Sequence, residues 1–201
     1  ALAGANQPIA LLKEILQPGS RAPRKAQIGT MYARDVQEMV VPASSIVKLA
    51  RTGSADIPAP SIVKSRRGEV SVAVTGISAL ELTQPGLGVA RSLRMAPEVA
   101  QVIGLGYAST DTGLFRKEIF DICARMPIVA NENKSKIEQV DEATLNRLIA
   151  IKKNHGLDIL IPNLDLEIPC YQRIADDLKS RGIHTLLPTP AATDKLNKQG
   201  L

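Results

Sequence analysis

The sequence has few aromatic side chains. Its 201 residues include no tryptophan, three tyrosines and two phenylalanines. Hydrophobic residues still make up 44% of the chain, so the core must be built mainly from aliphatic side chains. Proteins that bind single-stranded nucleic acid usually combine a dense basic face with aromatic residues for base stacking. The scarcity of aromatics therefore counts against a nucleic-acid partner.

Cysteines and long apolar segments are also scarce. Cys123 and Cys170 lie 47 positions apart and form no CxxC pair, so no metal or redox motif is indicated. We expect two buried thiols in a reducing compartment. No run of about 18 apolar residues occurs, so we expect no membrane partner and take the cytoplasm as the location.

The net charge of +5 is unevenly distributed. Residues 1–69 contain 10 Lys/Arg and 5 Asp/Glu, whereas residues 70–201 contain 15 of each. The short clusters at Arg21–Lys25 and Arg66–Arg67 are typical of solvated linker charge. We therefore predict two parts: an N-terminal segment, 1–69, of unknown role with a basic linker, and a domain that covers 70–201.

The N-terminal segment has weak periodicity and is predicted to be mostly helical or irregular. Helical patterns cover residues 8–17, 31–40 and 43–51. The stretch Gly53–Gly68 contains two prolines and ends in basic residues, so it is interpreted as a connector.

Residues 70–201 alternate short apolar runs with helical patterns. The predicted strands are residues 70–75, 99–105, 126–130, 157–161 and 183–187. The predicted helices are residues 88–95, 114–125, 141–156 (with Asp141 as N-cap) and 169–181, with Gly182 just past the end of the last one. Such alternation indicates an α/β fold, with a parallel sheet and helices on both faces. Ligands of such sheets approach the carboxyl ends of the strands, which selects the loops 76–87, 106–113 and 162–168.

The first of these loops contains Gly76, Gly86 and Gly88. Glycine allows backbone amides to come close to a ligand, and a following helix N-terminus favours an anion. Nine residues separate Gly76 from Gly86, and no Gly-Lys-Ser/Thr follows, so the loop has neither a dinucleotide fingerprint nor a Walker A motif. A long loop whose glycines only satisfy turn geometry is the alternative.

Three acidic residues follow predicted strands. Asp111 comes six residues after the second strand, where an acidic residue can bind the ribose of a cofactor, although a turn aspartate is the alternative. Asp165 and Glu167 follow the fourth strand. They could bind a cationic substrate group, a metal or a neighbouring domain. Either could instead cap the helix that begins near Pro169.

Six segments occur in an order that resembles a known domain. They are residues 72–76, 85–94, 102–105, 111–115, 158–169 and 182–195. In this order they are similar to the first strand, first helix, second strand, following loop, Asp-x-Glu turn and exit segment of the pre-ATP-grasp domain. That domain is Rossmann-like and begins the ATP-grasp superfamily ligases; the branch most similar is that of the carbamoyl phosphate synthetase large subunit. The resemblance covers residues 70–198.

The resemblance implies that the chain is the substrate-side domain of an ATP-dependent carboxylate–amine ligase. In that family ATP and Mg²⁺ bind to later subdomains, which would be supplied in cis or by a separate chain. The resemblance thus implies no ATP-binding module and no tightly bound cofactor here. By resemblance, Gly76, Gly86, Gly88, Asp165 and Glu167 face the small-molecule substrate. Neither the catalytic residues nor the substrate are specified.

Two other functions remain open. The chain could be a Rossmann oxidoreductase or epimerase domain that uses a nicotinamide cofactor, although the glycine fingerprint is missing and Asp111 comes late. It could also be a non-enzymatic domain in which residues 1–69 mediate assembly with a partner, as their charge suggests. A homo-oligomer is compatible with each function.

Overall fold

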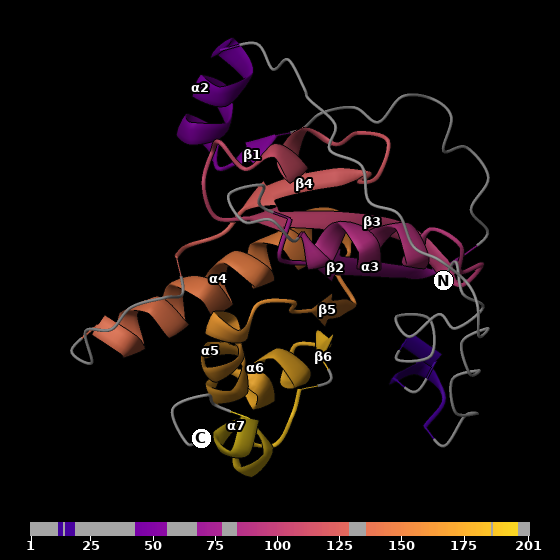
Figure 1. Ribbon diagram of the computed structural model, residues 1–201, viewed down its shortest axis with the longest axis vertical. Coiled ribbons are helices and arrows are strands. Elements are labelled where there is room, and N and C mark those ends of the chain that lie inside the picture. Colours follow the sequence, from indigo (N-terminus) through magenta and orange to yellow (C-terminus); the bar gives the residue numbers. More distant parts are fainter. Residues whose placement is uncertain are drawn as a thin grey trace.

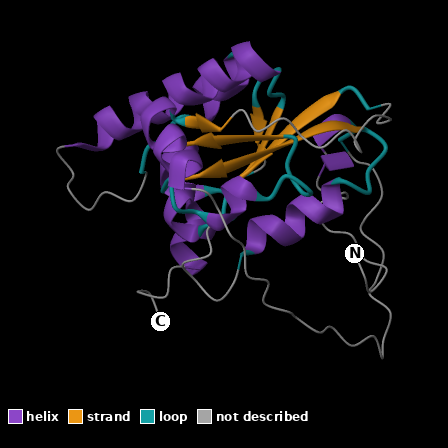
Figure 2. Cartoon of the chain, turned by 90° about the horizontal axis from the view of Figure 1, so that it is seen from above, coloured by secondary structure: helices purple, strands orange, loops and turns teal. Residues whose placement is uncertain are grey.

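The computed structural model describes residues 12–13, 15–18, 43–55, 68–77, 84–128, 136–185 and 187–196. These residues form a single sheet with helices on both of its faces (Figures 1 and 2). The predicted α/β architecture with a parallel sheet is therefore confirmed, and the fold is Rossmann-like.

Across the sheet, the strands of the described residues follow the order β1-β4-β3-β2-β5-β6. The strands β2 to β6 are mutually parallel, and β1 joins the edge of β4 in the antiparallel direction. The chain therefore starts the parallel sheet in its middle, moves outward through β3 and β4, and returns to the other side of β2 with β5. The strands are β1 (Ser54–Ala55), β2 (Val70–Val74), β3 (Val99–Gly106), β4 (Ile122–Arg125), β5 (Ile159–Ile161) and β6 (His184–Thr185).

The helices cover the two faces unequally. One face carries α3, and the opposite face carries α4, α5 and α6. The helical segments are α2 (Ala43–Thr52), α3 (Pro85–Leu93), η2 (Thr112–Phe115), α4 (Ile137–His155), η4 (Asp165–Glu167), α5 (Ile168–Arg173), α6 (Ala175–Ser180) and α7 (Pro190–Leu196).

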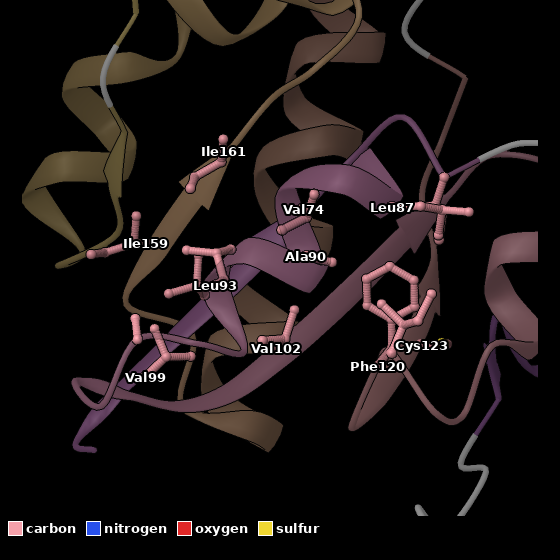
Figure 3. Close-up of a cluster of buried hydrophobic side chains, with 14 of the residues drawn as sticks. Val74, Leu87, Ala90, Leu93, Val99, Val102, Phe120, Cys123, Ile159 and Ile161 are labelled. Atoms are coloured by element: carbon pink, nitrogen blue, oxygen red, sulfur yellow. The ribbon is translucent and has the colours of Figure 1, made fainter. Parts of the chain in front are cut away.

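Alternate residues of each strand supply the two cores, because successive strand side chains point to opposite faces. On the first face, Val74, Val102 and Ile161 meet Ala90 and Leu93 of α3 (Figure 3). On the second face, strand side chains pack against α4, α5 and α6; the buried members there include Ala73, Ile103, Leu148, Tyr171 and Leu178. The strands are thus apolar on both sides, as their sequence patterns predicted.

Part of the N-terminal segment belongs to the same core. Leu12 and Leu49 are fully buried in the cluster that contains α3. Within the predicted connector, Ser54 and Ala55 form β1 and pair with β4. Arg147 of α4 holds this junction in place, because its guanidinium donates hydrogen bonds to the carbonyl oxygens of Gly53 (2.7 Å) and Arg125 (2.9 Å).

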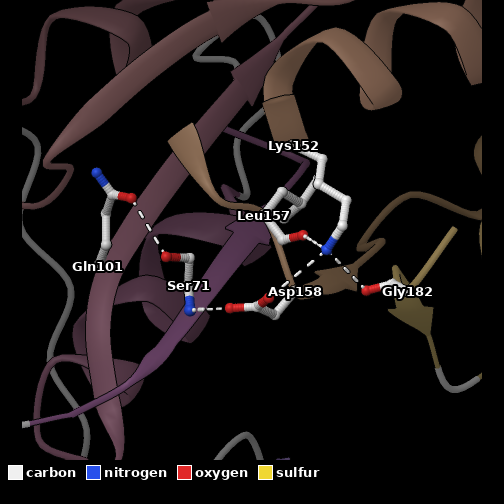
Figure 4. Close-up of polar contacts among 6 residues, drawn as sticks. All are labelled: Ser71, Gln101, Lys152, Leu157, Asp158 and Gly182. Atoms are coloured by element: carbon white, nitrogen blue, oxygen red, sulfur yellow. Dashed lines mark hydrogen bonds and ion pairs between the residues drawn. The ribbon is translucent and has the colours of Figure 1, made fainter. Parts of the chain in front are cut away.

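The amino edge of the sheet is closed by a polar network (Figure 4). The Asp158 carboxylate accepts a hydrogen bond from the Ser71 amide (3.0 Å) and forms an ion pair with Lys152 (3.7 Å). The same ammonium group donates to the carbonyl oxygens of Leu157 (3.0 Å) and Gly182 (3.1 Å). These bonds fix β5 beside β2 and join both to the end of α4.

The helix predicted over 114–125 and the strand predicted over 126–130 are wrong. The chain instead makes a short 3₁₀ turn, η2, and then the strand β4. Asp121 determines this outcome: its amide donates to the Val102 carbonyl (2.9 Å), and its carboxylate accepts from the Val102 amide (2.8 Å). The pairing aligns the next four residues with β3, so tertiary hydrogen bonds override a helical pattern. Residues 129 and 130 lie outside the described ranges.

Helix boundaries also differ from the predictions. The helix α4 begins at Ile137, so Asp141 is an interior residue and not an N-cap; its carboxylate accepts two hydrogen bonds from Arg173 (2.6 and 2.8 Å). The helix predicted over 169–181 is divided at Ile174 into α5 and α6. The predicted helix 43–51 is confirmed as α2, residues 12–13 and 15–16 of the predicted helix 8–17 are helical, and the predicted helix 31–40 lies outside the described residues.

The buried and exposed side chains of α2 provide a test of its place in the fold. Leu49 has an exposed fraction of 0%, whereas Val47 has one of 55%. We expect Leu49→Ala to lower the free energy of unfolding by about 2–5 kcal/mol, because it leaves a cavity in the core. Val47→Ala, the control on the same helix, should change it by less than about 0.5 kcal/mol. Urea unfolding monitored by circular dichroism measures both, and equal effects would contradict the assigned packing of α2.

Candidate functional site

The candidate site lies where β2 and β5 end side by side. The two strands run parallel, with Val74 opposite Ile161, and the chain leaves them toward opposite sides of the sheet. This is the topological switch point, at which open α/β sheets bind their ligands. The Thr75 amide extends the pairing by donating to the Ile161 carbonyl (3.3 Å). The residues that follow the two strands therefore share one edge.

Two of the predicted glycines are required by the packing of the first loop. Gly76 has a φ of +69°, which favours glycine. Gly86, the second residue of α3, lies against the end of β2, and its amide donates to the Gly76 carbonyl (3.0 Å). A Cβ atom on Gly86 would lie 2.0 Å from the Thr75 carbonyl oxygen. The strand end and the helix are therefore in direct backbone contact. Residues 78–83 of this loop lie outside the described ranges.

Gly88 differs from these two glycines. It is exposed on α3, and a Cβ atom there would meet nothing within 4 Å. The structure thus brings Gly76 and Gly86 together at the switch point, while Gly88 lies two residues farther along the helix, on its exposed side.

The N-terminus of α3 has little capacity left for an anion. Pro85 has no N–H group, the Gly86 amide is bonded to Gly76, and the Leu87 amide donates to the Gln84 carbonyl (3.1 Å). A helix N-terminus binds phosphate through free amides of its first turn. The residues Pro85, Gly86 and Leu87 therefore offer no free amide to a phosphate.

Asp111 is buried within its own loop. Its Oδ2 atom accepts hydrogen bonds from the amides of Tyr107 (2.7 Å) and Ala108 (3.0 Å), directly after β3. Two residues later, the Gly113 amide donates a hydrogen bond to the carbonyl oxygen of Ile77, the residue that follows Gly76 (3.1 Å). This bond joins the loop after β3 to the loop after β2. These bonds fit the turn interpretation of Asp111, and its exposed fraction of 2% leaves little of the side chain accessible to a ribose hydroxyl.

Glu167 lies at the centre of a buried polar layer beneath this edge. Its side chain has an exposed fraction of 0%. One carboxylate oxygen accepts a hydrogen bond from the Thr75 hydroxyl (2.5 Å), and the other accepts one from the Tyr107 hydroxyl (2.6 Å). Glu167 therefore joins the ends of β2 and β3 to the start of α5. It occupies the N-cap position of α5, but its side chain does not cap that helix.

The environment of Glu167 favours its neutral form. Burial raises the pKa of the Glu167 carboxyl group, and the hydrogen bonds from Thr75 and Tyr107 act in the opposite direction. No Lys or Arg of the described ranges forms an ion pair with it. Burial also raises the pKa of Tyr107, and the adjacent Tyr171 and Glu167 add to that effect.

Asn163 and Asp165 lie in the turn between β5 and α5. The Asn163 amide donates to the Thr75 hydroxyl oxygen (2.9 Å), and its side-chain Nδ2 donates to the carbonyl oxygens of Thr75 (3.2 Å) and Ile161 (2.9 Å). Asp165 begins η4 and is exposed. In the described ranges its carboxylate has no hydrogen bond or ion pair with another residue.

Other reactive groups do not contribute to this edge. Cys123 and Cys170 are both buried, as predicted, and form no disulfide; burial raises the pKa of each thiol to about 12. Neither is a thiolate at neutral pH, which a nucleophilic cysteine requires. Within the described ranges, no three His, Cys, Asp or Glu side chains are grouped closely enough to hold a metal ion.

No protein family model matches the chain, and no curated protein matches it in sequence. The helices of the described ranges lack the combination of length and apolar composition that a bilayer-spanning helix needs.

The sequence indicated the edge but not its hydrogen-bonding residues. Thr75 and Tyr107 come directly after a strand, and Asn163 is the second residue after β5. That position is the only signal that would have selected them. Tyr171 belongs to α5 and has no such signal. Its apolar surroundings make it look like an ordinary core residue.

The two glycines of α3 form a matched pair for testing the loop. Gly86→Ala should lower the free energy of unfolding by at least about 1–3 kcal/mol, because its Cβ would overlap a backbone oxygen that cannot move independently. Gly88→Ala should raise it by about 0.5–1 kcal/mol, because alanine is the better helix former and the space is open. Chemical unfolding measures both changes. A well-tolerated Gly86→Ala would contradict the backbone contact.

The burial of Glu167 predicts a pH dependence with a definite sign. Because the folded-state pKa is raised above the ordinary value of 4.5, the folded state holds its proton more tightly than the unfolded state. The stability contributed by this group is complete below pH 4.5 and is lost as the pH rises through the folded-state pKa. The loss is at most about 1.4 kcal/mol per pH unit between the two pKa values.

Glu167→Gln isolates this contribution, because glutamine has a similar shape and no charge. We expect the stability of wild type relative to Glu167→Gln to decrease as the pH rises from 4.5. Thermal unfolding over a series of buffers gives the difference at each pH. Glu142→Gln, an exposed change on α4, is the control. A relative stability that increases with pH would show that the folded protein favours the ionised carboxylate.

Proposed function

We propose that this chain is the substrate-side, pre-ATP-grasp domain of an ATP-dependent carboxylate–amine ligase. The observation that carries the proposal is the switch point between β2 and β5, where a glycine-dependent loop meets the turn that contains Asp165 and Glu167. Both were selected by the resemblance to that domain. Their occurrence on one edge of a Rossmann-like sheet supports a common role in holding a small molecule.

The hydrogen bonds at the edge support a domain that does not itself bind the nucleotide. The first-turn amides of Gly86 and Leu87 already have partners, so the described residues fit a triphosphate poorly. We therefore propose that ATP and Mg²⁺ bind to a separate ATP-grasp module, in cis or on another chain.

In this proposal the chain contributes position and not the phosphoryl-transfer groups. Hydrogen bonds from Thr75 and Tyr107 to Glu167 hold two strand ends and the 163–167 turn in a fixed arrangement. A substrate bound at such an edge is presented in one orientation, and orientation alone contributes strongly to reactions between two bound groups. We place this role in the cytoplasm.

The nicotinamide-dependent alternative is less well supported. A dinucleotide would need free amides at the start of α3 and an accessible carboxylate after β3. The amides are engaged, and Asp111 bonds to Tyr107 and Ala108. The assembly alternative is favoured by no particular contact, since the described part of residues 1–69 packs into the core of the same sheet.

Nucleotide assays on the purified chain test the proposal. We expect no Mg²⁺-dependent phosphate release from ATP and no change in NADH fluorescence on addition of the chain. We also expect ATP hydrolysis to appear when an ATP-grasp module from the same reading frame or a neighbouring gene is supplied. Steady ATP turnover by the chain alone would overturn the ligase-domain proposal, and NADH binding would restore the oxidoreductase alternative.

A further inference from the structure

Glu167 joins a rigid part of the fold to a short, exposed turn. Its partners Thr75 and Tyr107 directly follow β2 and β3, which lie in the interior of the sheet. Glu167 itself is the last residue of η4 and its buried member. The other two residues of η4, Asp165 and Leu166, are exposed, and the exposed fraction of Leu166 is 67%. The Glu167 side chain is therefore the main attachment of η4 to the strand ends.

The residues on either side of η4 are held independently of Glu167. Before it, the Asn163 side chain donates hydrogen bonds to the carbonyl oxygens of Thr75 and Ile161. After it, Tyr171 of α5 has an exposed fraction of 0% and belongs to the second core. A movement that carries Glu167 away from the strand ends can therefore be confined to residues 164–167.

An ionised Glu167 has no counter-charge among the described residues. No Lys or Arg of these residues forms an ion pair with it. Its partners on the strands are the hydroxyl groups of Thr75 and Tyr107, and the backbone amides that also act on it belong to Asn163 and Leu164 of its own turn. A buried carboxylate without a cation is costly. Ionisation therefore favours an arrangement in which the carboxylate reaches water.

The elements packed around Glu167 carry five other titratable side chains besides the exposed Asp165. They are Tyr107 and Asp111 after β3, Cys170 and Tyr171 on α5, and Asp141 on α4. Burial raises the pKa of both tyrosines, and that of the thiol to about 12, so all three are neutral at neutral pH. The Asp111 carboxylate accepts hydrogen bonds from two amides of its own loop, and Asp141 is paired with Arg173. Of these carboxyl groups and Glu167, only Glu167 combines complete burial with hydroxyl partners on other elements.

We propose that Glu167 is a proton-dependent latch for the 164–167 turn. In its protonated form the side chain holds the turn on the ends of β2 and β3, and ionisation releases the turn toward solvent. The inference goes beyond the proposed function, because it describes how the carboxyl edge of the sheet is regulated whichever ligand binds there.

Release of the turn would change the candidate site directly. Leu164 rests on the first loop, since a Cβ atom placed on Gly76 would lie 3.4 Å from Leu164 Cδ2. When residues 164–167 leave the strand ends, this side of Gly76 becomes accessible, and Asp165 moves with the turn. The protonation state of Glu167 thus determines which groups line the switch point.

The sign of the pH dependence follows from the two environments of the carboxyl group. In the released turn the group is in water and has its ordinary pKa of 4.5, whereas burial raises the pKa in the closed turn. Opening is therefore independent of pH below 4.5. Above it, the equilibrium constant for opening rises by up to about tenfold per pH unit, until the closed-state pKa is reached.

The test is native-state hydrogen exchange of the 201-residue chain, followed by NMR from acid to neutral pH and at several low urea concentrations. The reporters are the amides of Glu167 and Ile168, which donate to the carbonyl oxygens of Leu164 and Asp165. Ala73, buried in the central strand β2, is the reference for global unfolding. Opening of one turn exposes little surface, so we expect exchange of the reporters to be nearly independent of urea and exchange of Ala73 to depend on it strongly.

Glu167→Gln isolates the proton. Comparison of the same amides at the same pH cancels the intrinsic pH dependence of exchange. We expect the protection of the reporters in wild type, relative to Glu167→Gln, to fall by up to about tenfold per pH unit above pH 4.5. Glu142→Gln, an exposed change on α4 with the same loss of charge, should leave the wild-type profile unchanged.

Tyr107→Phe tests the latch with the carboxyl group retained, and it serves also if Glu167→Gln does not fold. The hydrogen bond from Tyr107 lowers the pKa of Glu167, so its removal should raise the pKa in the closed turn. We expect the upper end of the pH-dependent range to move to higher pH. A purely structural role of the tyrosine hydroxyl would weaken protection equally at every pH.

Three results would overturn the inference. The first is reporter amides that exchange only through the urea-dependent opening seen at Ala73, because the turn would then not open by itself. The second is a ratio of wild type to Glu167→Gln that does not change with pH. The third is a pH profile that Tyr107→Phe does not displace. None of these measurements depends on the outcome of the ATP and NADH assays.

Discussion

The pairing of β2 with β3 on one side and β5 on the other is the constraint on which the candidate site depends. Because all three strands are parallel, their carboxyl ends meet at one edge, and the chain must leave β2 and β5 toward opposite faces. Residues more than 80 positions apart, such as Thr75 and Asn163, consequently share hydrogen bonds. Each feature of the edge follows from that juxtaposition: the backbone contact of Gly86, the orientation of the Asn163 amide and the burial of Glu167.

Burial of Glu167 creates an energetic problem that the surrounding groups only partly solve. An ionised carboxylate far from water is stable only when it is paired or fully hydrogen-bonded. Here two hydroxyl groups donate to it, and no described cation lies against it. A proton on the carboxyl group removes the penalty of the buried charge, and it also provides a donor within a layer that contains two tyrosine hydroxyls. Burial therefore raises the pKa of this carboxyl group, against the opposing effect of its hydrogen bonds.

Much of the fold could be predicted because its signals are local. The runs that became β2, β3 and β5 are apolar on both faces, and Gly156 and Gly182 end helices with positive φ angles. The strand β4 could not be predicted in the same way. Ile122–Arg125 is only four residues long, and its conformation is determined by the hydrogen bonds of Asp121 to Val102. The hydrogen-bond partners of Glu167 could not be predicted either, because Tyr107 and Thr75 lie 60 and 92 positions away in the sequence.

The two edges of the sheet contain similar residue types but use them differently. At the amino ends of the strands, Asp158 and Lys152 form an ion pair, and each also forms hydrogen bonds with neighbouring backbone groups. Both charges are therefore neutralised within the protein. At the carboxyl ends of the strands, the side-chain N–H groups of Asn163 and the amides of Gly86 and Leu87 in α3 all donate hydrogen bonds within the protein. The side-chain oxygens of Asn163 and Asp165 accept no hydrogen bond from a described residue. Fold stability explains the first arrangement completely. It explains the second in part, because the two bonds that Asn163 donates hold the turn against the strand ends and thereby orient its oxygen, whereas the exposed Asp165 carboxylate forms no bond within the described residues.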